Sequence, residues 1–223
     1  MTTHDHHDTG HDHAAMDHSG HDMSNINTMA ASATLHCLTG CAIGEITGLI
    51  IGTALGLSTL TTIVLAISLA FLFGYLLSTL PLVKSGLGFF GALSIVFAAD
   101  TLSIATMELV DNAVMAVIPG AMEAGLVNHI FWIGMMIALT AAFVAAYPVN
   151  RYLLQRGKGH ALTHEYHHGA SEATGARRSI PSFSTPALAA VIAAFMFGGL
   201  IVSIADELGA DSGGHAQAQV QRD

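Results

Sequence analysis

The stretch HCLTGCAIGEITGLIIGTALG, residues 36–56, decides the fold of this chain. It holds one formally charged side chain, Glu45, and is about as long as the ~20 residues that a helix needs to cross a membrane. Glycine recurs at every fourth position, and in a helix these glycines share one face, which lets another helix approach closely. The glycine ridge consists of Gly40, Gly44, Gly48, Gly52 and Gly56. We predict a transmembrane helix whose ridge is suited to contact a second copy of the chain or a partner membrane protein.

The composition of the whole chain also points to a membrane. Of its 223 residues, 52% are hydrophobic and only 10% are charged, which is too apolar for an ordinary soluble domain. We expect spans at about residues 33–57, 60–81, 87–118, 129–154 and 185–204. The expected fold is therefore all-α, a polytopic integral membrane helical bundle with about five transmembrane helices in a lipid bilayer. The net charge of −9 speaks against a nucleic-acid partner.

Polar segments divide the chain into five parts. We expect a disordered His-, Asp- and Met-rich metal-binding tail over residues 1–31, a four-span bundle over 32–155, a His-containing cytoplasmic loop over 156–184, a fifth span over 185–205 and a disordered C-terminal tail over 206–223. As one helix, residues 87–118 would be about 48 Å long. Because the hydrocarbon core is only ~30 Å thick, this segment must tilt, protrude or break.

Basic residues near the span ends predict the orientation of the chain. They are Lys84, Arg151, Arg156, Lys158, Arg177 and Arg178. Such residues concentrate in cytoplasmic connections, whereas the connection over residues 119–128 has none. The N-terminal tail is then expected in the cytoplasm.

The tail carries histidines interleaved with aspartates and methionines. The histidines are His4, His6, His7, His11, His13, His18 and His21. Imidazole binds Cu(II), Zn(II), Ni(II) and Co(II), and the thioethers of Met16, Met23 and Met29 favour Cu(I), so we expect metal binding with copper first. The alternative is a polar acidic tail that only solvates the terminus.

A second histidine cluster lies in the loop between the fourth and fifth spans. It comprises His160, His164, His167 and His168, which share one face if this segment is helical. Histidines four residues apart can chelate one ion, which suggests a relay or sensing site for metal. Histidines that are solvated or touch lipid headgroups are the alternative.

The first span carries ionisable and soft groups beside the glycine ridge. His36 and Cys37 open this pattern, and Cys41 and Glu45 continue it at four-residue intervals. The two cysteines sit on one helical face as free thiols, which favour Cu(I) or Zn(II), and a carboxyl group inside a span is a functional candidate. The alternative is that the cysteines only pack and that Glu45 is a protonated structural acid.

The third span carries a polar stripe. Asp100, Met107 and Asp111 fall within about 40° on a helical wheel, and Ser103, Glu108 and Met115 flank them. A bare charge at mid-bilayer costs roughly 2.5–3.5 kcal/mol, so this stripe should face protein, water or a cation. Protonated carboxyl groups that bond between helices, together with Asn112, are the alternative.

These patterns resemble a bacterial membrane family known as domain of unknown function 4396. The stretches that carry the resemblance are LHC (35–37), GCAIGE (40–45), DTLSI (100–104), ME (107–108), DN (111–112), PGAM (119–122), PVNR (148–151) and GKGHA (157–161). The resemblance covers about residues 34–168 and implies a compact multi-pass protein of the bacterial inner membrane, often associated with copper handling. It implies no established activity and no assigned ligands.

We therefore expect a metal-cation transporter or metal-handling protein that favours copper. Its soft-ligand mouth would lie at His36, Cys37 and Cys41, and the carboxyl groups of Glu45 and of the third span would line the path. One alternative is a membrane metalloenzyme or redox protein, although no catalytic motif is recognisable. Another is a non-transporting metal chaperone that docks a partner through the glycine ridge.

Overall fold

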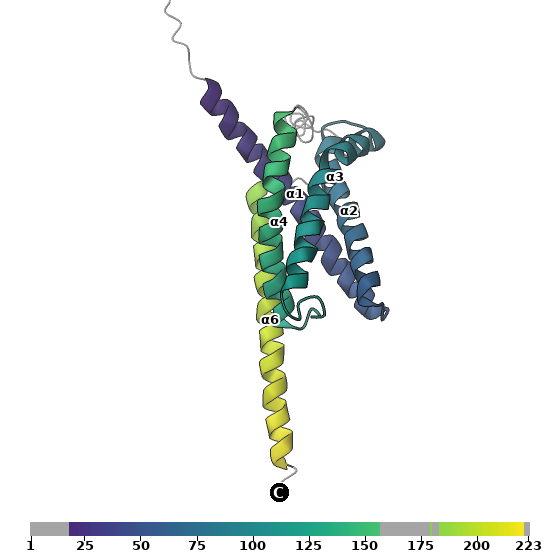
Figure 1. Ribbon diagram of the computed structural model, residues 1–223, viewed down its shortest axis with the longest axis vertical. Coiled ribbons are helices and arrows are strands. Elements are labelled where there is room, and N and C mark those ends of the chain that lie inside the picture. The colour runs from purple at the N-terminus through teal and green to yellow at the C-terminus, as the bar shows by residue number, and fades with distance from the viewer. Residues whose placement is uncertain (1–17, 157–178, 180–182, 221–223) are drawn as a thin grey trace, which may run out of the picture.

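The computed structural model describes residues 18–156, 179 and 183–220; for 18–25, 99 and 210–220 it describes the backbone only. The helices are α1 (His18–Ala54), α2 (Thr59–Lys84), α3 (Phe89–Val117), α4 (His129–Gln155) and α6 (Thr185–Val220). In Figure 1, α1, α3 and α6 run in one direction, while α2 and α4 run in the opposite direction. The predicted all-α helical bundle is confirmed.

The described helices account for the predicted spans. Four of them are long and apolar enough to cross a membrane, namely the helical stretches Ile26–Ala54, Thr59–Lys84, His129–Gln155 and Thr185–Gly209. The two parts of α3, Phe89–Ala98 and Asp100–Val117, meet at an angle of 55° and make a fifth span if they are counted together. The long third segment is therefore broken by a bend beside Asp100.

Helix α1 begins earlier than the sequence predicted. Residues 18–31, which we expected in the disordered tail, are helical because this end of α1 is held by other helices. The Nε of Arg151 donates a 2.8 Å hydrogen bond to Oδ1 of Asn27, and the Thr185 hydroxyl donates a 2.9 Å bond to the Ser32 hydroxyl. Ala30 is fully buried beside these contacts.

The C-terminal helix also extends further than expected. We predicted a disordered tail from residue 206, but α6 continues to Val220. Its first turn beyond the predicted span is tied to α4, because Nδ1 of His129 lies 2.6 Å from Oε2 of Glu207. About two turns earlier, Gly199 faces the ring of Trp132, where a Cβ atom would collide with the indole.

The glycine ridge holds α1 against α2 of the same chain. A Cβ atom on Gly40 would lie 2.5 Å from Cα of Gly74, and one on Gly48 would lie 2.5 Å from Cα of Ala66. Between them, Gly44 lies against the backbone of Ala70. The expectation that this ridge contacts another protein is thus corrected: from Gly40 to Gly52 the ridge is covered by α2.

Replacing Gly44 with Ala should force α1 and α2 apart. Its new Cβ would meet backbone rather than a movable side chain, so we expect a loss of roughly 1–3 kcal/mol of stability. Thermal unfolding of the detergent-purified protein measures this change. Gly91→Ala is the matched control, because nothing lies within 4 Å of a Cβ there. Equal melting temperatures for the two variants would contradict the packing.

Removal of the His129 ring should loosen the end of α6. In His129→Ala, we expect faster amide exchange in residues 203–209 than in the unmodified chain, because Glu207 loses its bond to α4. Hydrogen exchange followed by mass spectrometry measures this rate. Asp206→Asn changes an exposed neighbouring acid and should leave the exchange unaltered. Unchanged exchange in His129→Ala would show that the ion pair does not hold this turn.

Candidate functional site

Two polar stripes meet where α1 packs beside α3. Both helices run in the same direction, so positions further along α1 meet positions further along α3. The contacts form three layers, which we call the thiol–carboxyl ladder. The layers pair Cys37 with Asp100, Cys41 with Glu108, and Glu45 with Asp111.

All six side chains of this ladder are buried. Their exposed fractions are 0% for Cys37, 1% for Cys41, 8% for Glu45, 1% for Asp100, 4% for Glu108 and 5% for Asp111. The prediction that the stripe of the third span faces protein rather than lipid is therefore confirmed. Ser103 from the same stripe is also fully buried and lies against Cys37.

Helix α2 closes the first layer of the ladder. Sγ of Cys37 lies 4.0 Å from the hydroxyl oxygen of Ser78, which is itself 3% exposed. Ser78 is not among the site residues predicted from the sequence. The available signal was the series Ala66, Ala70, Gly74 and Ser78, which repeats every fourth residue and matches the glycine ridge of α1.

The deeper layers contain carboxyl oxygens that no described hydrogen-bond donor reaches. Both side-chain oxygens of Glu45, both of Glu108 and Oδ1 of Asp111 are buried in this way. The Nδ2 of Asn112 donates a 2.9 Å hydrogen bond to the backbone oxygen of Glu108, one turn earlier in the same helix. Since two carboxylates cannot bond to each other without a proton, the layer of Glu45 and Asp111 needs a proton or a cation.

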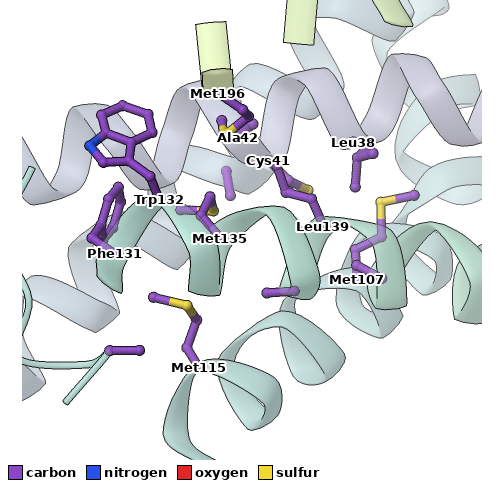
Figure 2. Packing of buried hydrophobic residues seen from close by; sticks show 14 of the residues in the cluster. Leu38, Cys41, Ala42, Met107, Met115, Phe131, Trp132, Met135, Leu139 and Met196 are labelled. Carbon is purple, nitrogen blue, oxygen red and sulfur yellow. The ribbon is translucent and has the colours of Figure 1, made fainter. Parts of the chain in front are cut away.

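Methionines pack in the same buried cluster as the two thiols. Met107 is 1% exposed and Met115 is 6% exposed, and both belong to one buried cluster with Cys37 and Cys41. Figure 2 shows Cys41 of α1 together with Met107 and Met115 of α3 and Met135 of α4 in this cluster. The thioethers pack in the core, and the thiols beside them make this a region of soft donors.

A cavity of about 360 Å³ reaches the ladder from the Glu45 end. Glu45 and Asp111 line its inner part, and its wall extends to Leu57 in the α1–α2 turn and to Glu123 in the α3–α4 connection. Cys37 and Cys41 are not among its lining residues. This cavity therefore reaches the ladder at the end opposite to the predicted mouth, and the mouth at the cysteines remains a prediction. His36 is half-buried, and its Nδ1 lies 2.9 Å from the backbone oxygen of Ser32.

The predicted metal ligands fall into two groups: those whose side chains the structure describes and those whose side chains it does not. Within the described part of the chain, no set of three or more His, Cys, Asp or Glu side chains has an arrangement that could hold a metal ion. The other candidates lie outside the residues whose side chains are described: His4, His6, His7, His11, His13, His18, His21, His160, His164, His167 and His168. Metal binding by either group remains a prediction.

The fold and the ladder define a polytopic helical membrane protein with buried thiols and carboxyl groups. The chain belongs to the family described as Domain of unknown function (DUF4396), whose model matches residues 27–159. This match includes α2, α3, α4 and every residue of the ladder, whereas α6 lies beyond it. No curated protein and no solved structure matches the chain.

The two thiols should be protected in the folded protein. Because Cys37 and Cys41 are at most 1% exposed, we expect N-ethylmaleimide to modify them at least about tenfold more slowly before than after denaturation in SDS. Mass spectrometry of the purified protein measures the modification. A thiol introduced as Thr53→Cys, on the cavity wall, should react rapidly under the same conditions. Rapid modification of Cys37 in the folded protein would contradict its burial.

Proposed function

We propose that this protein transports or handles metal cations in the membrane, with copper as its first candidate ion. The observation that carries the proposal is the direct packing of the thiol and carboxyl stripe of α1 on the carboxyl stripe of α3. No Lys or Arg occurs in residues 33–57 or 87–118, which contain the ladder. Negative charge in this interior must then be compensated by protons or by bound cations.

The donor atoms favour a soft metal at the Cys37 end. A thiol occupies each of the first two layers, and the thioether of Met107 lies in the same buried cluster. Thiolate and thioether ligands select Cu(I) over hard cations. A path that begins with carboxyl groups and continues to thiols supplies donors over about two turns of α1.

The positions of basic residues support a cytoplasmic N-terminal end. Lys84 is the last residue of α2, and Arg151 lies in the final turns of α4, which end on the same side of the bundle as the start of α1 (Figure 1). On this interpretation the histidines of the tail and of the loop 156–184 would supply or receive metal on the cytoplasmic side of a bacterial inner membrane. The cavity would then open to the opposite side.

Copper flux into proteoliposomes tests this proposal. We expect the unmodified protein to move Cu(I), and we expect Cys37→Ser and Asp100→Asn each to lower the initial rate by at least about tenfold, because each removes a donor from the first layer. Uptake is measured as copper retained in vesicles over time. Gel filtration and thermal unfolding of each variant separate loss of flux from loss of fold.

Two variants serve as matched controls for the copper assay. Met196→Leu replaces a buried thioether that belongs to α6 and not to the two helices that form the ladder, and Asp206→Asn removes an exposed carboxyl group. Both should retain the flux of the unmodified protein. Flux that is the same in Cys37→Ser, Asp100→Asn and the controls would refute a path through the ladder.

A further inference from the structure

We propose that the inner end of the cavity is a binding site for a hydrated, hard divalent cation such as Mg²⁺ or Mn²⁺, held by Glu45 and Asp111. This site differs in chemistry from the thiol layers. It does not depend on copper transport, since it holds whether or not the ladder carries a soft metal.

The carboxyl group of Glu45 lacks a donor within the described structure. Its side chain is 8% exposed, and neither oxygen has a hydrogen-bond partner among the described residues, although the residue lines the cavity. Oδ1 of Asp111 is also buried without a hydrogen-bond partner among the described residues, and the Asp111 side chain is 5% exposed. A buried carboxyl oxygen costs free energy unless it is protonated or bound. The empty space beside these atoms lets a ligand supply the missing interaction.

The charge of the cavity wall favours a cation. The lining residues include three carboxylic acids, Glu45, Asp111 and Glu123, and no Lys, Arg or His. Glu123 is exposed and belongs to the α3–α4 connection, so it extends the negative potential towards the opening. Two facing carboxyl groups at the inner end carry the charge that a divalent ion neutralises.

The donor set and the space select a hard ion. Beside the two carboxyl groups, the wall offers oxygen ligands from the Asn112 amide and from hydroxyl groups such as that of Thr62. The thioethers of Met115, Met122 and Met135 also line the cavity, but they are neutral, whereas every charged ligand in the wall is a carboxylate oxygen, which suits a hard ion. Mg²⁺ binds through one or two carboxylates and retains several waters, whereas thiols suit soft metals. About 360 Å³ is ample for a hydrated ion, since one water occupies roughly 30 Å³ in the liquid. The nearest thiol, Cys41, lies one turn before Glu45 in α1 and is not part of the cavity wall.

Titration of the purified full chain with Mn²⁺ tests the site. Electron paramagnetic resonance counts free Mn²⁺, and we expect one ion per chain that Mg²⁺ displaces. Displacement by Mg²⁺ distinguishes this oxygen site from histidines, which Mg²⁺ does not occupy. Glu45→Gln and Asp111→Asn should each weaken binding at least about tenfold, whereas Asp206→Asn should not change it. No Mg²⁺-sensitive ion, or equal affinity in all three variants, would overturn the proposal.

A second measurement leaves both acids intact, in case their replacement prevents folding. The variant Thr53→Cys places a thiol on the exposed part of the cavity wall, where a bulky maleimide can be attached. We expect this label to slow Mn²⁺ association, because it narrows the way to Glu45. Association at the same rate with and without the label would place the bound ion elsewhere and would refute the site. Copper flux can fail in either case without altering this result.

Discussion

The close approach of α1 and α2 fixes the rest of the structure. A ridge of glycines brings the two backbones into contact, so α1 can neither rotate nor slide against α2 without collision. Cys41 and Glu45 each follow a ridge glycine by one residue, which turns them about 100° around the helix. With the ridge on α2, this rotation directs the thiol and carboxyl stripe towards α3. The position of the ladder thus follows from the packing of the α1 glycines against α2.

Other helices complete the surroundings of α1 and keep its polar stripe from lipid. The amide of Asn150 on α4 donates a 2.8 Å hydrogen bond to the Thr34 hydroxyl, one turn before Cys37. Met135 and Leu139 of the same helix join the cluster around Cys41 (Figure 2). Burial away from lipid and, outside the cavity, from bulk water makes an ionised carboxyl group without a partner costly in free energy. The charge of the ladder therefore depends on which protons or cations its carboxyl groups bind.

Sequence periodicity predicted much of this arrangement. The spans follow from length and apolarity, and the four-residue spacing of Cys37, Cys41 and Glu45 and the polar stripe of the third span each define a helical face. Periodicity could not predict which helix covers the glycine ridge, because a face of small residues can pack against any helix that also has a face of small residues. The complementary series ending at Ser78 was visible in the sequence, but its antiparallel register depends on the short turn at Gly56, which has a positive φ of 64°.

The opening of the cavity was not predictable for a different reason. Its wall combines the α1–α2 turn with the α3–α4 connection, and no sequence pattern places such turns beside Glu45. The prediction of a mouth at the N-terminal end of the ladder was based on the histidines and cysteines there. The presence of soft ligands does not determine whether an ion can reach them from the solvent. Access depends on which side chains fill the space, and at Cys37 they fill it completely.

The bend of α3 divides that helix between two separate cores. Its first part, Phe89–Ala98, contributes Ala92 and Val96 to a small cluster with Leu82 of α2. The second part packs in the main cluster that contains the thiols. Asp100 stands at the junction of the two parts, and Tyr75 of α2 packs against both clusters. On the proposed function, an ion that passed along the whole ladder would require the Cys37 end to open, and the bend is where the helix ladder of α3 is already interrupted.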